Sequence, residues 1–457
     1  MTTPAGPLVS EWLGSGGEVA VVGFGKSGVA ATRLLRARGV AVYASDSASS
    51  ERCEAWAAEL RALGAAVEVG GHDLARVARA VAVVVAPGVP PDVPPLAAAR
   101  EAGVPIVAEV DLGFTELPRT RTVAITGTNG KTTTTSLIAH LMDAAGIRGI
   151  AAGNIGLPLC DLALAGDHPD WVALELSSFQ LHDAPHVRPA VGVLTNLAPN
   201  HLDRYATLEE YYGDKALLFR HADERSVWIS NADDAPVVEM VSGVAGRHIR
   251  FSIEKRADGW FDAASGALML GDEPLLPRAD LPLLGAHNVA NALAAALVLR
   301  EIGARSSDIA AGLRTFRAIP HRVEPVREVD GVLWINDSKS TNVTSTAVAI
   351  AALDRPFVLL LGGRHKGEPY TRLVPQLAGR CRAVVAYGES GPIVQQDLSS
   401  NGTTVTTAGS FEEVVATARR LAQPGDAVLL SPACSSYDMF RNYEERGARF
   451  RELVEAM

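Results

Sequence analysis

The stretch AITGTNGKTTTTS, residues 124–136, lies between an apolar run and a helical pattern. Its Gly-Lys-Thr step at 130–132 is typical of a phosphate-binding loop between a strand and a helix. In the general pattern another glycine stands five residues before the Gly-Lys pair. Ile125 holds that place here, and the nearest glycine, Gly127, comes two residues late. The stretch therefore predicts a phosphate loop of shortened form.

The chemistry of such a loop is still complete. Gly127, Asn129 and Gly130 can turn successive backbone N–H groups toward an anion. Lys131 would reach the terminal phosphates, and the hydroxyl of Thr132 would bind Mg²⁺ at the positive end of the following helix. The alternative is a polar turn with surplus threonines before a helix. A Gly-Lys-Thr step so soon after an apolar strand favours the phosphate loop.

Composition excludes several classes of protein. The 457 residues predict two to four domains, and 47% hydrophobic residues suffice for real cores. A formal net charge of −10 and 5% aromatic residues argue against a nucleic-acid binder. Four scattered cysteines without a C-x-x-C pair favour a reducing compartment. The chain lacks a signal peptide pattern and an apolar run long enough to span a membrane, so we expect a cytoplasmic protein.

Short apolar runs alternate with helical patterns along most of the chain, which predicts an α/β fold with parallel sheets. We place boundaries near residues 116 and 317, giving domains 1–116, 117–317 and 318–457. Short strands and hairpins are expected over 249–276, and a helix over 286–303. Strands are predicted at 18–23, 40–46, 80–88, 104–109, 122–127, 171–178, 191–196, 331–338, 357–363, 383–388 and 427–433.

A first glycine-rich turn, Gly23–Gly28, also follows a strand and opens a helix. Asp46 ends the next strand, where an acid that binds ribose would stand. One interpretation is a nucleotide site in which backbone N–H groups hold phosphate. The other is a tight turn in which glycines permit close packing. The context of strand, helix, strand and acid favours a nucleotide, without distinguishing NAD from another one.

Further candidates follow the strands of the central block. Glu175 ends an apolar strand, at the edge where α/β sheets bind ligands, and could take Mg²⁺. His201 and Asp203 come just after another strand. A lone histidine is more often structural, but its place in the block of the phosphate loop favours function. Lys215, on a predicted helix, reads by itself as a surface lysine.

The chain resembles the Mur ligases. The resemblance extends in order through all three blocks and rests on the segments TGTNGKTTT (126–134), GNIG (153–156), ELSSFQL (175–181), TNLAPNHLDRY (195–205), GAHNVANALAA (285–295), PHRVE (320–324), WINDSKSTN (334–342) and LLSPACSSYDMFRNYEERG (429–447). The shortened phosphate loop is the form of this family. WINDSKSTN and SPACSSYD separate it from the folylpolyglutamate synthetases, which share the central fold.

The resemblance implies three α/β domains: an N-terminal Rossmann-like domain, a central P-loop ATPase-like domain and a C-terminal Rossmann-like domain. It implies a monomeric enzyme that uses ATP to ligate D-glutamate to UDP-N-acetylmuramoyl-L-alanine through an acyl phosphate, a cytoplasmic step of peptidoglycan precursor synthesis. Some related ligases take L-glutamate, and the sequence does not separate the two.

The resemblance also implies which residues act. Lys131, Glu175, His201 and Lys215 are the implied catalytic residues. Of two Mg²⁺ ions, one is implied at Thr132 and Glu175, the other at His201 and a carbamate that CO₂ forms on Lys215. The implied ATP contacts are Gly127, Thr128, Asn129, Gly130, Lys131, Thr132, Thr133, Asn288, Asn291, Arg322, Asp337 and Lys339.

Substrate contacts follow in the same way. The first domain is implied to bind UDP rather than NAD. The UDP-sugar is implied to contact Gly25, Lys26, Ser27, Asp46, Ser47, Asn154, Ser177 and His201. The glutamate site is implied at Thr341, Lys366, Ser436 and Tyr443. The family commonly has phenylalanine at 443, and the loop around Lys366 carries extra basic residues here.

Three alternatives remain. A ligase for another amino acid is possible, although the Asp-x-x-Arg-Pro-type loop for meso-diaminopimelate is missing. An oxidoreductase with NAD at Gly23–Gly28 would leave the second loop and Lys215 unexplained. A non-catalytic UDP-sugar sensor would bind ATP without turnover.

Overall fold

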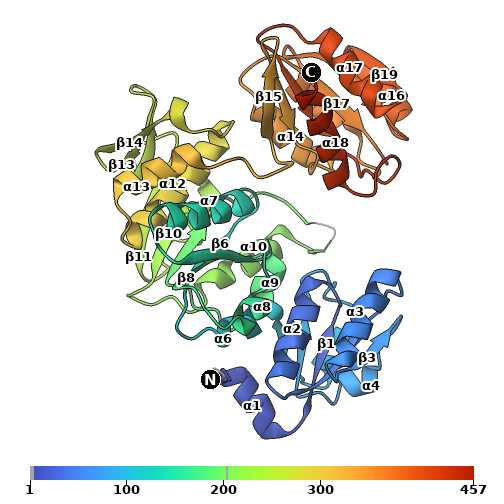
Figure 1. The fold of residues 1–457 in the computed structure, drawn as a ribbon. Coiled ribbons are helices and arrows are strands. Elements are labelled where there is room, and N and C mark those ends of the chain that lie inside the picture. The colour runs from blue at the N-terminus through green and yellow to red at the C-terminus, as the bar shows by residue number, and fades with distance from the viewer. Residues whose placement is uncertain (1–4, 202–203) are drawn as a thin grey trace. The chain divides into compact units, whose positions relative to one another are not determined.

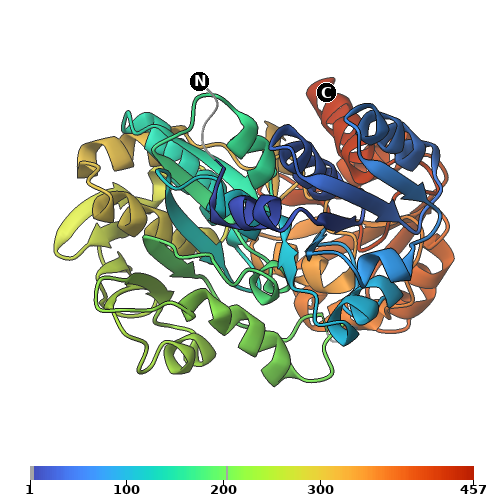
Figure 2. The same ribbon diagram turned by 90° about the horizontal axis from the view of Figure 1, so that it is seen from below.

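The computed structural model describes residues 5–201 and 204–457. These residues form two compact units. One runs to Leu281 and takes in Ala290–Thr315, and the other contains Pro282–Val289 and Phe316–Met457. The first unit holds two sheets and the second holds one, each covered by helices (Figure 1, Figure 2). Across these ranges, no helix combines the length and apolarity needed to cross a membrane.

The N-terminal sheet is parallel, with strand order β3-β2-β1-β4-β5. Val and Ala dominate β1 and β4, as expected of strands that are covered on both faces. Its strands are β1 (Glu18–Val22), β2 (Ala41–Asp46), β3 (Ala66–Val69), β4 (Ala82–Val85) and β5 (Ile106–Ala108). The helices are α1 (Pro7–Ser15), α2 (Lys26–Ala37), α3 (Glu51–Ala62), α4 (Leu74–Val77), α5 (Pro94–Glu101) and α6 (Glu109–Thr115).

The central sheet has the order β14-β13-β12-β11-β10-β9-β6-β8-β7 and turns antiparallel only at β12, β13 and β14. Its strands are β6 (Arg121–Thr126), β7 (Gly149–Gly153), β8 (Trp171–Glu175), β9 (Val191–Leu194), β10 (Val227–Asn231), β11 (Arg247–Ser252), β12 (Gly259–Asp262), β13 (Ala267–Leu270) and β14 (Glu273–Pro277). Its helices are α7 (Lys131–Ala144), α8 (Leu159–Leu164), α9 (Ser178–His182), α10 (Leu208–Ala216), α11 (Ala235–Met240) and α13 (Ser306–Thr315).

The register of this sheet assembles the site. The strand β6 lies between β8 and β9, with Ile125 opposite Glu175 and Thr126 opposite Leu194. Because all three strands are parallel, the segments that follow them leave the same edge of the sheet. The phosphate loop, Glu175 and the segment after Leu194 are therefore neighbours.

The second unit has a sheet of order β15-β16-β20-β17-β18-β19, parallel except for the pair β15 and β16. Its strands are β15 (Glu324–Val329), β16 (Val332–Asn336), β17 (Phe357–Gly362), β18 (Cys381–Tyr387), β19 (Val405–Ala408) and β20 (Ala427–Leu430). Its helices are α14 (Val343–Ala351), α15 (Val374–Leu377), α16 (Gly391–Ser399), α17 (Phe411–Leu421) and α18 (Tyr443–Glu455). The helix α12 (Ala286–Glu301) begins in this unit and continues in the other.

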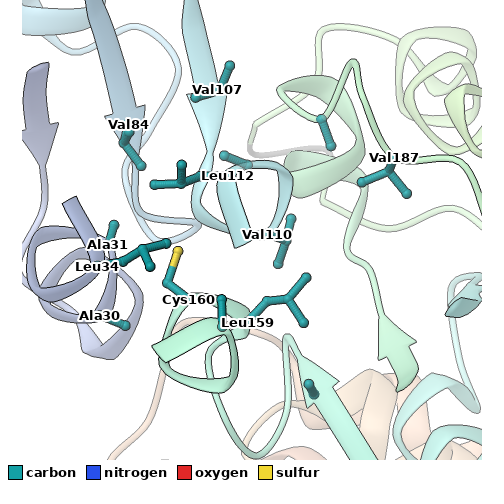
Figure 3. Close-up of a cluster of buried hydrophobic side chains, with 14 of the residues drawn as sticks. Ala30, Ala31, Leu34, Val84, Val107, Val110, Leu112, Leu159, Cys160 and Val187 are labelled. Carbon is teal, nitrogen blue, oxygen red and sulfur yellow. The ribbon is translucent and has the colours of Figure 1, made fainter. Parts of the chain in front are cut away.

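A continuous core joins the N-terminal and central sheets within the first unit. Side chains of α2, α6 and α8 meet there, among them Leu34, Val110 and Cys160 (Figure 3). A Cβ at Gly113 would lie 2.7 Å from the carbonyl carbon of Leu159, so glycine permits the close approach of α6 and α8. Burial of this apolar surface fixes the two sheets to each other.

The predicted α/β fold is confirmed, and so are the strands, the hairpin region and the helix predicted near 286. The sequence missed β3, β7 and β19, which lie at sheet edges and contain several half-buried or exposed residues. It also missed β10 and β15. Edge strands lack the long apolar run that marks a buried strand. The domain boundaries near 116 and 317 stay predictions.

Candidate active site

The phosphate loop requires its two glycines. The loop runs from the end of β6 to Gly130, the N-cap of α7. Gly127 has φ 144° and Gly130 has φ 80°, values that favour glycine. A Cβ at Gly130 would lie 2.5 Å from the amide oxygen of Asn291, and one at Gly127 would lie 2.0 Å from Oγ1 of Thr195. The loop is thus packed closely on both sides.

The segment after β9 holds the loop in place. Asn196 accepts the N–H of Asn129 at 2.9 Å and donates back to its carbonyl at 2.9 Å. The hydroxyl of Thr195 donates to the same carbonyl at 2.7 Å. Oγ1 of Thr128 accepts the N–H of Ala198 at 3.0 Å. These hydrogen bonds hold the phosphate loop in a defined conformation.

Two lysines converge on one carbonyl of the loop. The ammonium of Lys131 donates to the carbonyls of Gly127 at 2.9 Å and Thr128 at 2.8 Å. Nζ of Lys215 donates to the Gly127 carbonyl at 2.7 Å, and this side chain is only 1% exposed. Burial, reinforced by the charge of Lys131, lowers the pKa of Lys215 well below its ordinary value, and Asp214 opposes this shift. Lys215 is therefore a buried amine at the phosphate loop, not a surface lysine.

Glu175 is a buried carboxylate whose two oxygens differ in their surroundings. It is 1% exposed, and Oε1 accepts the amide N–H of Asn154 at 2.8 Å. Oε2 is buried and has no hydrogen-bond partner among residues 5–201 and 204–457. An unpaired buried carboxylate oxygen is costly, and a cation would compensate it. Thr132 lies in the first turn of α7, and this helix begins at the same edge of the sheet.

Ser177 and Asn154 lie at the same edge as Glu175. Ser177 is the N-cap of α9 and forms a capping box with Gln180, whose Oε1 accepts the N–H of Ser177 at 3.0 Å. The backbone N–H of Asn154 donates to the carbonyl of Glu175 at 3.0 Å. These contacts fix the two predicted substrate residues beside the carboxylate.

His201 and Lys215 approach the same ring. His201 has φ 54°, and its imidazole lies 6.0 Å from the ring of Tyr211 and 5.1 Å from that of Phe179, centroid to centroid. Nζ of Lys215 lies 4.7 Å from the Tyr211 centroid. Within 5–201 and 204–457, no three His, Cys, Asp or Glu side chains gather to hold a metal by themselves. Asp203 lies outside the described residues.

The first glycine loop opens on a cavity of about 350 Å³. The predicted UDP-binding residues line it, namely Gly25, Lys26, Ser27, Asp46 and Ser47. Asp46 itself organises the loop, because its carboxylate accepts the N–H groups of Phe24 at 2.6 Å and Ala48 at 2.8 Å. His72, which the sequence did not single out, also lines the cavity, and burial lowers its pKa.

A larger cavity of about 500 Å³ lies between the N-terminal and central sheets and shares Ala86, Pro87 and Val89 with the first. Arg204 crosses it, donating to the carbonyl of Val89 at 2.8 Å with its guanidinium 3.7 Å from the ring of Phe179. The amide nitrogen of Gln180 is buried there and has no hydrogen-bond partner in the described part of the chain. The sequence motifs ELSSFQL and TNLAPNHLDRY contain Gln180 and Arg204, but the sequence alone predicts no role for these two residues.

The candidate ATP contacts divide between the units. Asn291 belongs to the first, and its Oδ1 accepts the hydroxyl of Thr134 at 3.3 Å beside Gly130. Asn288 belongs to the second, together with Arg322, Asp337 and Lys339.

Within the second unit, Asp337 is buried and accepts from the N–H of Val323 at 3.1 Å and the hydroxyl of Ser431 at 2.7 Å. Burial raises the pKa of Asp337 to about 6. Nε of Arg322 is buried and no residue that the structure describes bonds to it, and Nζ of Lys339 lies 5.6 Å from the ring of Tyr443.

The candidate glutamate residues lie on three segments of the second unit. Nζ of Lys366 donates to Oγ1 of Thr341 at 3.2 Å. Ser436 is buried after β20. Tyr443 begins α18, and its carbonyl accepts the hydroxyl of Ser338 at 2.8 Å. Burial raises the pKa of Tyr443 to about 12, so its hydroxyl keeps its proton at neutral pH.

Three family models match successive parts of the chain. Residues 17–108 match the Mur ligase MurD-like N-terminal domain, 125–299 the Mur ligase middle domain, and 321–434 the Mur ligase glutamate ligase domain. The UDP-N-acetylmuramoylalanine–D-glutamate ligase of Acidobacterium capsulatum is 41% identical over 450 residues, covering 96% of each chain. The chain belongs to the Mur ligase family.

Other relatives agree with this membership. The UDP-N-acetylmuramoylalanine–D-glutamate ligase of Pelotomaculum thermopropionicum is 38% identical to this Mur ligase, covering 96% of this chain and 97% of the relative. Among solved structures, the UDP-N-acetylmuramate-alanine ligase MurC from Thermotoga maritima has a TM-score of 0.59 at 19% identity, covering 96% of this chain and 99% of that one. This structural likeness confirms the fold of the Mur ligase.

Proposed function

We propose that this Mur ligase joins D-glutamate to UDP-N-acetylmuramoyl-L-alanine with ATP, a step of peptidoglycan precursor synthesis. Relatives named for this ligation match nearly the whole chain at 37–41% identity. The observation in the structure that carries the proposal is the meeting of Lys131 and Lys215 at Gly127. A carboxylate that must approach the polyphosphate of ATP needs positive charge at this loop, which Lys131 supplies directly, and the buried amine of Lys215 stands beside it for carbamylation.

The reaction has two steps. The substrate carboxylate attacks the γ-phosphorus of ATP, the bond to the bridging oxygen breaks, and ADP leaves the acyl phosphate. The amine of glutamate then attacks the acyl carbon, inorganic phosphate leaves, and the nitrogen loses its proton as the amide forms. Charge builds up on the transferred phosphoryl group, and preorganised donors stabilise it.

The chain supplies these donors from one loop. Lys131 exchanges its carbonyl contacts at Gly127 and Thr128 for phosphate oxygens, and the N–H groups at the N-terminus of α7, from Gly130 to Thr132, bind the same anion. The loop is held beforehand by Thr195 and Asn196, so little reorganisation accompanies binding. In-line placement of the carboxylate supplies the entropic part of catalysis.

The residues present fit Mg²⁺. The unpartnered oxygen of Glu175 is an oxygen ligand of the kind that Mg²⁺ prefers. In our proposal Glu175 and Thr132 hold one ion, and His201 and carbamylated Lys215 hold a second. Bound there, Mg²⁺ would neutralise phosphate charge during transfer.

Lys215 has the properties that carbamylation needs. Its lowered pKa leaves a larger share of the amine neutral, and only the neutral nitrogen can attack CO₂. The new C–N bond forms as the nitrogen loses a proton, and the product is an anionic oxygen ligand. The burial that makes an ammonium costly thus favours its conversion.

Substrate binding is assigned by the same reasoning. We propose that UDP occupies the cavity at Gly25 and Asp46, and that the sugar–peptide arm reaches Asn154, Ser177 and His201. The glutamate would contact Thr341, Lys366, Ser436 and Tyr443 of the second unit, and ATP would also contact Asn288, Arg322, Asp337 and Lys339. A monomeric state and a cytoplasmic location remain part of the proposal.

The decisive experiment measures ADP release from ATP and UDP-N-acetylmuramoyl-L-alanine with four amino acids in parallel. These are D-glutamate, L-glutamate, L-alanine and diaminopimelate. We expect turnover with D-glutamate. Preference for L-glutamate or another amino acid would correct the substrate, and ATP binding without ADP release would indicate a sensor instead of an enzyme.

A further inference from the structure

The loop that carries Lys366 is joined to the segment that carries Ser436. The backbone N–H of Arg364 donates to the carbonyl of Ser435 at 2.9 Å, and the Ser435 hydroxyl donates back to the Arg364 carbonyl at 3.3 Å. Arg364 also forms a bidentate pair with Glu389 at 2.9 and 3.0 Å. The loop is therefore held in a defined register beside the candidate glutamate residues.

His365, between Arg364 and Lys366, is oriented by a contact with a buried side chain. Its Nδ1 lies 3.0 Å from the hydroxyl of Tyr370, which is fully buried. That hydroxyl lies 2.7 Å from Sγ of Cys434, and Oγ of Ser390 lies 3.4 Å from the same sulfur. Burial raises the pKa of Tyr370, so its hydroxyl stays protonated. A buried chain of hydrogen bonds thus fixes the imidazole.

The proton of the Tyr370 hydroxyl decides what the rest of the ring offers. We assign it to Nδ1 of His365, with the Cys434 thiol donating to the Tyr370 oxygen, so that the proton of the neutral imidazole sits on Nε2. In the part of the chain that the structure describes, no hydrogen bond reaches Nε2. The ring is half-buried, and its Nδ1 faces the buried hydroxyl of Tyr370.

We propose that His365 is a specificity-determining residue that donates its Nε2–H to the side-chain carboxylate of the amino-acid substrate beside Lys366. This inference rests on the proposed function. Glutamate brings two carboxylates to the site, and Lys366 is a point charge on a flexible stem. A ring held by Tyr370 adds a directional donor, so a dicarboxylic amino acid gains over one with a neutral side chain.

Two substitutions separate this role from loop support. His365→Gln places an amide nitrogen near the position of Nε2, whereas His365→Asn places its amide near Nδ1 and keeps only the partner for Tyr370. The assay is steady-state ADP release, with the KM for D-glutamate, the KM for ATP and kcat measured separately. His168→Ala is the matched control, because His168 is also half-buried and lies among none of the predicted site residues.

We expect His365→Asn to raise the KM for D-glutamate about tenfold, as loss of one hydrogen bond to a charged group predicts, with kcat and the KM for ATP nearly unchanged. His365→Gln should recover most of the loss, and Tyr370→Phe should raise the same KM by a smaller factor because it frees the ring to turn.

The reverse pattern, in which Asn preserves the KM and Gln raises it, would reduce His365 to loop support and overturn the inference. Unchanged KM values in all three variants would overturn it too, while the proposed function stands. A wild-type enzyme that releases no ADP with D-glutamate would overturn both.

Discussion

The two glycine loops of the first unit have the same backbone arrangement but are surrounded by different charges. Each links a parallel strand to a helix and contains a glycine at positive φ, Gly23 in one and Gly127 in the other. In the first, the Asp46 carboxylate accepts the N–H of Phe24, and Lys26 is exposed. In the second, the ammonium of Lys131 and the buried amine of Lys215 converge on the Gly127 carbonyl. The glycines provide only the turn, and the surrounding charges determine whether a loop holds a ligand or promotes its reaction.

The strongest test of this difference is Lys131→Ala. Removing the ammonium leaves the γ-phosphate without its clamp, so we expect ATP turnover to fall by about 10³-fold or more. The measurement is ADP release at saturating substrates. Lys255→Ala, at an exposed lysine far from both loops in sequence, is the control. Normal turnover in Lys131→Ala would show that the charge of the second loop is not catalytic.

Lys215→Ala tests the buried amine at the second loop. It should lower kcat by about 10²–10³-fold, because an anionic oxygen ligand can no longer form. Bicarbonate together with a short carboxylic acid should restore part of the activity, since the acid can occupy the vacated space. Full activity without these additions would exclude the carbamate.

The core that joins the N-terminal and central sheets, and so holds both glycine loops in one unit, makes the stability of the protein depend on pH. Burial raises the pKa of Glu109 to about 7 from the usual 4.5, and its Oε1 accepts the N–H of Cys160 at 2.6 Å. Between those values the folded state keeps a proton that the unfolded state has lost, so the free energy of unfolding falls as pH rises. Glu109→Gln keeps the hydrogen bond and removes this loss.

We therefore expect the stability of Glu109→Gln relative to the wild type to increase between pH 4.5 and 7, by up to about 3 kcal/mol. Thermal midpoints of the two proteins at pH 5 and pH 8 measure it. If the thermal midpoints of the two proteins differ by the same amount at both pH values, Glu109 ionises in the folded protein as it does in the unfolded chain.

The smallest expected effect concerns the first loop. Lys26→Ala should raise the KM for the UDP-sugar about tenfold, the size of one charge-assisted hydrogen bond, and leave kcat nearly unchanged. Steady-state kinetics with the UDP-sugar varied at saturating ATP measures this. A loss in kcat as large as that of Lys131→Ala would remove the distinction between the two loops.

Local patterns in the sequence predicted most of the fold. Buried parallel strands such as β6 and β17 are continuous apolar runs, and they were found. The edge strands β3, β7 and β19 were missed because their residues are mixed and their pairing depends on the neighbouring strand.

The candidate site could be predicted only in part. The geometry of Gly127 and Gly130 follows from residue type. Lys215 is different, because its partner lies 88 positions earlier in the chain and its burial depends on how α10 packs. The contact between Tyr370, the partner of His365, and Cys434 likewise joins residues 64 positions apart that only folding brings together.

The burial of Lys215 also has a consequence for chemical labelling. An amine sealed beneath a loop selects its reaction partners by size: a linear three-atom gas fits where a bulky activated ester does not. In a lysine-profiling experiment on the native enzyme, such an ester should modify the exposed Lys26, Lys255 and Lys366 and leave Lys215 unlabelled.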